Sequence, residues 1–219
     1  MLAKVNSFSI LGIKALRIQV EVDLSPELPV FNTVGLPDGA VRESKERVRA
    51  ALVNSGYAMP VNRITVNLAP ADIRKEGAAF DLPIALGILA AAGAIDGSAL
   101  EDMAVVGELA LDGSIRSVRG CLAMAMVAAE NKYKYLIVPE ANALEAAVAA
   151  NDIIVLAAGR LNQVLEHLNG VSRLERVVAD LSDILICSLM NTDPTWRKCA
   201  ARNRPSAPLP LPRPAAIIC

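Results

Sequence analysis

Aromatic side chains are scarce in this chain: they make up 3% of its 219 residues, whereas hydrophobic residues make up 53%. A core of stacked aromatic rings is therefore excluded, and Ala, Val, Leu and Ile must fill the interior. The formal net charge is −1, so no overall charge draws the protein toward nucleic acid or a membrane surface. The length allows one domain or two.

The chain has few cysteines and no apolar run long enough to cross a membrane. The four cysteines have neither metal-ligand spacing nor the pattern of a compact disulfide framework, which fits a reducing cytoplasm. The longest apolar run, residues 82–95, is shorter than the roughly 20 residues that cross a bilayer. The first residues lack the continuous apolar core of a signal peptide. We therefore expect a soluble, cytoplasmic protein with no metal site and no membrane partner.

A phosphate-binding loop is also missing from the sequence. Such a loop needs the pattern Gly-x-x-x-x-Gly-Lys-Ser/Thr, because backbone amides wrap the phosphates while the lysine and the hydroxyl serve the γ-phosphate and Mg²⁺. None of the thirteen glycines begins this pattern, and residues 74–77, Arg-Lys-Glu-Gly, have a single glycine in the wrong order. We expect no nucleotide hydrolysis by this chain and no cofactor bound to it.

Composition divides the chain near residue 170. Residues 1–170 are rich in Ala, Val and Leu and contain 15 basic and 19 acidic residues, whereas residues 171–219 contain 7 basic and 4 acidic ones. Six of the thirteen prolines lie in the last 26 residues. We expect one folded domain over 1–170, followed by a linker and a disordered Pro/Arg-rich tail over 171–219.

The folded part begins with antiparallel strands and continues as alternating strands and helices. Apolar and polar residues alternate over 2–8 and 15–23, which predicts a hairpin. From residue 103 onward the strand and helix patterns alternate, which is typical of strands covered by crossover helices. The prediction is an α/β domain with antiparallel N-terminal strands and C-terminal β-α repeats. Further predicted elements are a strand at 30–34, a helix capped by Asp38, a strand at 64–68, a helix capped by Asp81 and a single strand at 104–111.

Four segments follow one another in a familiar order: KVNSFSILGI at 4–13, VGLPDGAVRESKERVRAAL at 34–52, ITVNLAPAD at 64–72 and FDLPIALG at 80–87. Together they resemble the N-terminal domain of the ComM/YifB family of magnesium-chelatase-like AAA+ proteins. The resemblance implies a ribosomal protein S5 domain 2-like fold, which the Lon peptidase domain shares. In full-length members it also implies an AAA+ domain that uses ATP and Mg²⁺, assembles into rings on DNA and promotes branch migration during natural transformation. The implied partners are that AAA+ domain and further copies of the chain.

Two linked segments, residues 74–87 and 106–120, resemble the active-site segments of a Lon-type peptidase with the chemistry removed. An ungapped comparison places Ala79 at the position of the serine nucleophile and Leu122 at that of the lysine base. A methyl and an isobutyl group supply no proton donor or acceptor, so no catalytic residue is expected. The resemblance therefore implies a non-catalytic accessory or assembly domain.

The sequence after residue 184 departs from the family pattern, in which an Ala-rich helix leads into the phosphate loop. Residues 200–214 have the proline and arginine content that results when GC-rich alanine codons are read one nucleotide out of register. We hypothesise a frameshifted product truncated before the ATPase domain, and the downstream reading frame tests this. The alternative is a genuine ligand, because residues 208–214 (PLPLPRP) suit a polyproline helix in an SH3-like groove.

Basic residues in two regions are candidates for contacts with nucleic acid or a protein partner. Arg42, Lys45 and Arg49 have helical spacing, which places them in one stripe beside the apolar face of the first helix. The alternative is a solvated face held by exposed pairs such as Glu43–Arg47. Further candidates, near loops and strand ends of the Lon-like segments, are Arg74, Lys75, Arg116 and Arg119.

Acidic and nucleophilic side chains have simpler explanations than catalysis. Asp72 suits a turn after a proline, and Glu108 follows a glycine in a predicted strand. Cys121 has no neighbouring histidine to activate its thiol, so we expect a buried, inert side chain. His167 lies in the last turn of a predicted helix, where its charge is favourable.

Three classes of function remain. The favoured one is a non-catalytic domain of a ComM-like DNA-remodelling ATPase, expected as a monomer or weak oligomer with feeble, salt-sensitive DNA binding. The second is a residual peptidase or another hydrolase that uses acidic loop residues. The third is a protein-interaction module that uses the Pro-rich tail.

Overall fold

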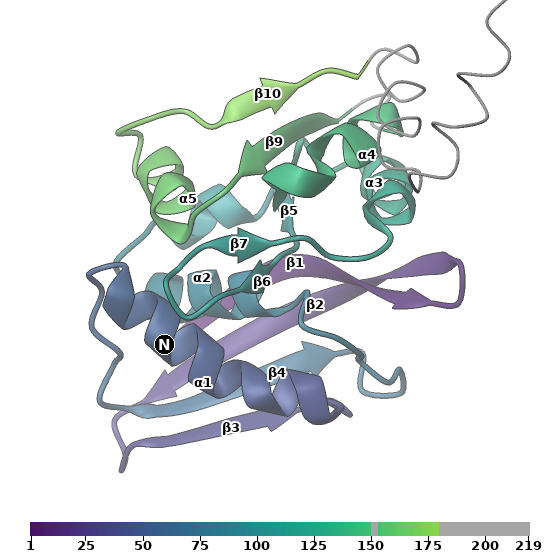
Figure 1. The fold of residues 1–219 in the computed structure, drawn as a ribbon. Helices are drawn as coiled ribbons and strands as arrows, with labels where there is room; N and C mark the ends of the chain where they lie inside the picture. Colours follow the sequence, from purple (N-terminus) through teal and green to yellow (C-terminus); the bar gives the residue numbers. More distant parts are fainter. Residues whose placement is uncertain (150–152, 180–219) are drawn as a thin grey trace, which may run out of the picture. The chain divides into compact units, whose positions relative to one another are not determined.

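The computed structural model describes residues 1–149 and 153–179 (Figure 1). Within these ranges an eight-stranded mixed sheet has the order β10-β9-β8-β5-β1-β2-β4-β3, and β6 and β7 form a separate two-stranded ribbon. The strands are β1 (Leu2–Leu11), β2 (Lys14–Ser25), β3 (Val30–Val34), β4 (Arg63–Ala69), β5 (Met103–Val105), β6 (Glu108–Leu109), β7 (Ile115–Arg116), β8 (Tyr135–Pro139), β9 (Ile154–Ala158) and β10 (Glu175–Val177). The helices are α1 (Gly39–Asn54), α2 (Asp81–Ala91), α3 (Cys121–Glu130), α4 (Ala143–Val148) and α5 (Leu161–Leu168), with short 3-10 turns η1 (Gly97–Leu100) and η2 (Glu140–Asn142).

The predicted N-terminal hairpin is confirmed. β1 pairs antiparallel with β2 along the whole length of β1, and Gly12 takes the left-handed φ of 63° that the tight turn between them requires. β4 pairs antiparallel with β2, and β3 lies parallel to β4 at the edge of the sheet. Buried and partly exposed residues alternate along β4, as expected of a strand with only one covered face.

The α/β alternation after residue 103 is also confirmed, with β5, β8 and β9 parallel to one another. The single strand predicted over 104–111 divides into β5 and β6. The reason is that the Gly107 amide leaves the sheet and donates to the carbonyl of Ala79, at 3.0 Å. β8 is buried at four successive positions, because helices cover both faces of the parallel part of the sheet.

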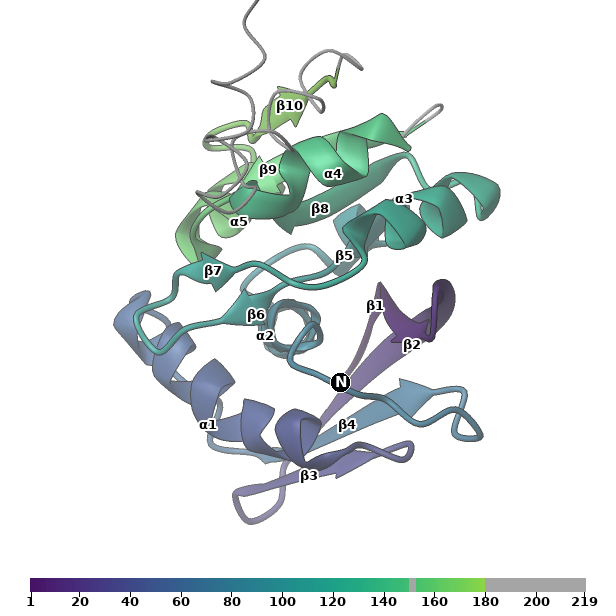
Figure 2. The same ribbon diagram turned by 45° about the vertical axis from the view of Figure 1, so that its right-hand side comes forward.

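Two core clusters lie on opposite faces of the sheet. One joins α1, α2 and α5 to the sheet, and the other joins α3 and α4 to it around Phe8. Figure 2 looks nearly along α2, which packs against α1 and against β1 and β2. Every residue of α2 is buried, so its sequence DLPIALGILAA is apolar on all sides after its first residue.

The two predicted helix caps have different outcomes. Asp38 is confirmed as the cap of α1, because its carboxylate accepts a hydrogen bond of 2.8 Å from the Val41 amide. Asp81 is not a cap: Phe80 holds the cap position without a side-chain bond, and Asp81 is the first residue of α2. Its carboxylate instead accepts hydrogen bonds from Arg47 and from the Leu109 amide.

The sheet continues past the domain boundary that composition predicts at residue 170, because β10 pairs antiparallel with β9. The Pro/Arg-rich tail and the frameshift hypothesis concern residues that lie mostly outside the described ranges, which end at residue 179. In those ranges no helix has the length and apolar character needed to cross a membrane.

Candidate functional site

Ala79, where the sequence predicts a lost nucleophile, lines a cleft of about 550 Å³ between the end of β1 and the loop that precedes α2. The loop is fixed by two backbone bonds to Gly107, which donates to Ala79 and accepts from Leu82, both at 3.0 Å. A Cβ atom at position 107 would lie 2.9 Å from the Ile115 side chain, so this close approach requires glycine. We call this hollow the Ala79 cleft; its lining also includes Ser9, Asp38, Glu76, Glu108, Ser117 and Arg119.

The carboxylates of the Ala79 cleft already have partners. Asp38 accepts from the amides of Val41 and Gly77 at 2.8 and 3.3 Å. Glu108 lies 3.7 Å from the guanidinium of Arg116. Glu76 pairs with Arg74 at 3.4 Å, and both of these side chains are exposed. These contacts agree with the structural explanations that the sequence suggests for Asp38 and Glu108, and they give Glu76 an ion-pair partner.

Among the described residues, no side chain of the cleft lining is bonded to a hydroxyl that it could activate. Ser9 is 3% exposed and its hydroxyl has no hydrogen-bond partner, so no base is in place to accept its proton. No lysine, cysteine or histidine belongs to the cleft lining in the described part of the chain. The same ranges contain no group of three metal-binding side chains.

Leu122 does not line the Ala79 cleft, so the structure does not bring the two degenerate positions to one cavity. Gly120 ends the preceding loop with a φ of 81° and packs closely against Ile10, and α3 then begins with Cys121 turned into the core. Leu122 follows it on the outer side and is 41% exposed. As predicted, Cys121 is buried, and burial together with the charge of Glu145 raises the pKa of its thiol to about 12.

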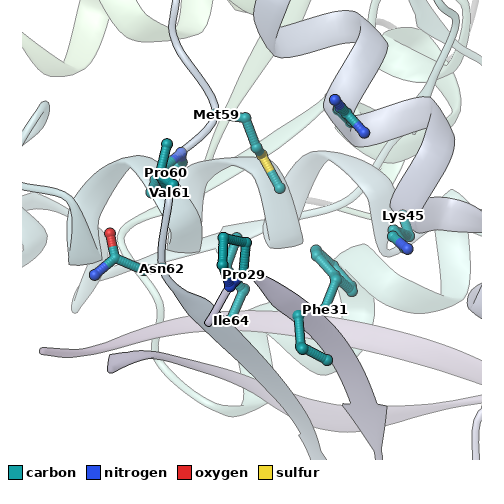
Figure 3. A pocket seen from close by; sticks show the side chains of 10 residues that line it. Pro29, Phe31, Lys45, Met59, Pro60, Val61, Asn62 and Ile64 are labelled. Atoms are coloured by element: carbon teal, nitrogen blue, oxygen red, sulfur yellow. The ribbon is translucent and has the colours of Figure 1, made fainter. Parts of the chain in front are cut away.

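The predicted basic stripe on α1 separates into two places. Lys45 and Arg49 border a groove of about 490 Å³ between α1, β3 and the loop before β4 (Figure 3). Arg42 instead shares a hollow of about 420 Å³ with Arg74, at the N-terminal end of the same helix. The spacing therefore predicts the helix face correctly but not the neighbours that each cation has.

Lys75 was predicted as a surface contact, and the structure shows that prediction to be wrong. Its side chain is fully buried, and its amine donates to the carbonyl of Pro70. Desolvation lowers the pKa of this amine, and the negative charge of Asp72 opposes the shift. The backbone of Lys75 also pairs with the segment before α1, because its amide donates to Leu36 and its carbonyl accepts from Asp38. The burial of the side chain and its bond to Pro70 leave the amine unavailable to a partner.

Arg116 is the last residue of β7, and Arg119 lies on the segment that leads from β7 to α3. Arg116 is held near Glu108, whereas Arg119 lines the Ala79 cleft. Neither of them lines the hollow that Arg42 and Arg74 share. The seven predicted cationic contacts therefore do not form one patch.

Sequence reasoning missed an ion pair between Arg47 and Asp81. The guanidinium of Arg47 donates to both carboxylate oxygens, at 2.6 and 3.0 Å, and also to the Ala40 carbonyl. Arg47 is therefore a partly buried link between α1 and α2, and its exposed partner Glu43 is farther away at 3.9 Å. Burial raises the pKa of Asp81 to about 6 even though the guanidinium opposes this rise, and the same pairing raises the pKa of Arg47.

His167 has a structural explanation in the last turn of α5. Its Nδ1 accepts a hydrogen bond of 3.2 Å from the Leu174 amide, which fixes the chain that leads to β10. Desolvation, followed by the nearby charge of Arg173, lowers the pKa of this imidazole. The neutral ring therefore acts as an acceptor here, in place of the favourable helix-end charge that the sequence suggests.

Comparison with protein families assigns the class of this domain. The family model described as subunit ChlI of Mg-chelatase matches residues 20–142, which is more than half of the chain. Within that class, the chain belongs to the ComM/YifB family of magnesium-chelatase-like proteins.

Three relatives illustrate the family. The competence protein ComM of Haemophilus influenzae is 44% identical over 173 residues, which cover 79% of this chain and 34% of that protein. YifB proteins of Salmonella typhimurium and Escherichia coli are 42% and 40% identical, over 81% and 84% of this chain and 35% and 38% of their own lengths. The chain thus spans little more than a third of the length of these relatives.

Proposed function

We propose that this chain is a non-catalytic accessory domain of a ComM-like DNA-remodelling ATPase. We include in this proposal that it has the S5 domain 2-like fold of Lon-type peptidase domains without their chemistry. The observation that supports it is that Ala79, which the resemblance to Lon-type peptidases places at the nucleophile position, lines the Ala79 cleft with a methyl group. Among the described residues, the lining supplies no amine, thiol or imidazole, and the Ser9 hydroxyl is bonded to no base.

The alternative is a hydrolase that uses the acidic residues of the cleft. Such an enzyme needs a carboxylate that is free to take or give a proton. Asp38 is engaged with two amides, and Glu108 lies beside Arg116. This arrangement favours the non-catalytic function.

Three assays on the purified chain test the non-catalytic function. We expect no hydrolysis of fluorescently labelled casein above buffer, no covalent labelling by a fluorophosphonate, and no phosphate release from ATP with Mg²⁺. The Ala79→Ser variant is the matched comparison: it adds the hydroxyl without a base, so it is also expected to be inactive. The proposal would be overturned in favour of the hydrolase if the unaltered chain hydrolysed casein and the Glu108→Gln variant did not.

A DNA contact is the second part of the proposed function. Arg42 and Arg74 support it, because these two exposed cations line one hollow beside the N-terminus of α1. Glu76 lies 3.4 Å from Arg74. Of the two cations in this hollow, Arg42 is therefore the one without an ion-pair partner among the described residues. Two phosphate contacts give weak binding with a shallow dependence on salt.

Fluorescence anisotropy with a labelled single-stranded oligonucleotide measures this contact. We expect weak binding that falls with rising salt, and a salt slope smaller by about 1 to 2 in the Arg42→Glu, Arg74→Glu double variant. Lys14→Glu is the control for a charge reversal away from the hollow, because Lys14 is exposed at the start of β2. Equal binding by the control and the double variant would remove the DNA contact while leaving the non-catalytic assignment intact.

A further inference from the structure

β3 is an edge strand with an apolar groove beside it. It pairs with β4 on one side, and no other strand of the described residues pairs with its second edge. Side chains from β3, β4 and the loop before β4 form the floor of the groove, and α1 forms its wall. Figure 3 shows Pro29, Phe31 and Met59 gathered between the helix that carries Lys45 and the strands below it. We call this hollow the α1–β3 groove.

Apolar side chains that line the groove are exposed to solvent. Val30 on the strand is 47% exposed and Val61 on the loop is 80% exposed, and both line the groove. Phe31 and Met59 are partly buried because they also pack against the core below. Proteins commonly protect an edge strand with charges, prolines or a covering segment, and here the apolar side chains beside the edge remain open.

The charged side chains that line the groove are both positive. Lys45 and Arg49 lie one turn apart on α1, and no acidic side chain lines the groove in the part of the chain that the structure describes. Arg49 has no ion-pair partner there, and the nearest carboxylate to Lys45 is the exposed Glu46, at 3.8 Å. Two cations above an apolar floor complement a partner that presents an apolar side chain next to carboxylates.

We propose that the α1–β3 groove binds an extended, acidic segment of a partner protein, which adds a strand to the free edge of β3. Backbone hydrogen bonds to β3 supply part of the affinity. Because alternate residues of a strand face the same side, an apolar residue flanked two positions away by Asp or Glu inserts its side chain into the groove. The flanking carboxylates then pair with Lys45 and Arg49.

A peptide fits this groove better than nucleic acid does. Nucleic acid binding relies on an extended track of cations and on aromatic faces that are free to stack with bases. The groove has two cations, and its aromatic side chain, Phe31, is packed against the core. This surface shares no lining residue with the Arg42–Arg74 hollow, so the peptide site can be tested independently of the proposed DNA contact.

The probe for this site is a fluorescein-labelled peptide of sequence Asp-Thr-Leu-Thr-Glu, measured by anisotropy with the whole chain at low salt. We expect saturable binding with a Kd below about 1 mM. Affinity should fall at least about tenfold in the Lys45→Glu, Arg49→Glu double variant and in Val61→Asp, and stay unchanged in Lys14→Glu. These positions are not fully buried, so circular dichroism should confirm that each variant folds. A peptide with Lys in place of its two acidic residues should not bind.

Hydrogen exchange separates strand addition from simple charge attraction. Bound peptide should slow exchange of amides in Val30–Val34 and leave the distant β8 unaffected. The proposal is overturned if the acidic peptide fails to bind, or if it binds the double variant as well as the native chain. It is also overturned if a short oligothymidylate binds at Lys45 and Arg49 while the peptide does not.

Discussion

Gly87 in the middle of α2 lies directly against Val22 of β2. A Cβ atom placed on Gly87 would stand 2.6 Å from the Cγ2 atom of Val22 and 3.6 Å from the Val5 side chain. Glycine normally weakens a helix interior, so its presence here reflects the close approach of α2 to the sheet. Because α2 is buried along its whole length, this contact sets how near the central helix lies to β1 and β2.

The Gly87→Ala variant tests this contact. We expect it to lower the free energy of unfolding by about 1 to 3 kcal/mol, because the branched Val22 side chain has no free end to swing away. Gly39→Ala is the matched control, since nothing lies within 4 Å of a Cβ at the start of α1 and its φ is not left-handed. Urea unfolding should show the control unchanged or more stable by up to about 1 kcal/mol. Equal stability of the two variants would contradict the close-packing explanation.

Loss of Arg47 should cost more stability than loss of its exposed partner Glu43. We expect Arg47→Ala to lower the free energy of unfolding by about 3 kcal/mol at neutral pH, since the Asp81 carboxylate is then left buried without its partner. Glu43→Gln removes only the exposed contact at 3.9 Å and should change stability by less than about 0.5 kcal/mol. Denaturant unfolding of both variants measures this difference, and similar costs would show that the ion pair is not structural.

Asp81 should also make stability depend on pH. Its native pKa is raised to about 6, above the unfolded value near 4, so between these values the native state keeps a proton that the unfolded state has released. The free energy of unfolding should therefore fall as pH rises from about 4 to 6, by on the order of 3 kcal/mol from this group. The difference between the free energies of unfolding of the native chain and of the Asp81→Asn variant, measured across this pH range, isolates the contribution of Asp81. A difference that grows with rising pH would show that Arg47 instead holds the pKa of Asp81 low.

Two adjacent cations, Arg74 and Lys75, should behave differently on charge reversal. Lys75→Glu places a carboxylate in a fully buried position opposite the Pro70 carbonyl and should destabilise the fold by about 3 kcal/mol or more. Arg74→Glu changes an exposed side chain and should alter stability by less than about 0.5 kcal/mol. Thermal unfolding of the two variants compares them directly. If both melted alike, the burial of Lys75 would be refuted.

Much of the fold follows from local patterns in the sequence. The hairpin, the Asp38 cap and the strand-helix alternation depend on periodicity and on capping chemistry, which act over a few residues. The division of residues 104–111 into two strands was not predictable, because it depends on Gly107 bonding to Ala79, far away in the sequence. β10 was missed because its composition resembles that of a linker, and its pairing with β9 is what makes it a strand.

The site was only partly predictable for the same reason. Helical spacing placed Arg42, Lys45 and Arg49 on α1, yet the partners of each cation come from other segments. Lys75 was misassigned because a lysine in a polar loop is normally exposed, and only the folded loop shows its amine turned inward. Arg47 gave one usable signal, its position next to the buried face of α1, but its partner lies 34 residues away.

The central sheet is joined unevenly across β1. This strand meets β2 over its whole length but meets β5 at one pair, Asn6↔Ala104, where the Asn6 side-chain amide also donates to the Met103 carbonyl at 3.3 Å. Few backbone bonds therefore hold the antiparallel strands to the β-α repeats. Subglobal unfolding should begin along this line, so amides next to it should exchange faster than those between β1 and β2. Because β5 emerges about a hundred residues after β1, a growing chain on the ribosome completes the hairpin long before it can close this junction.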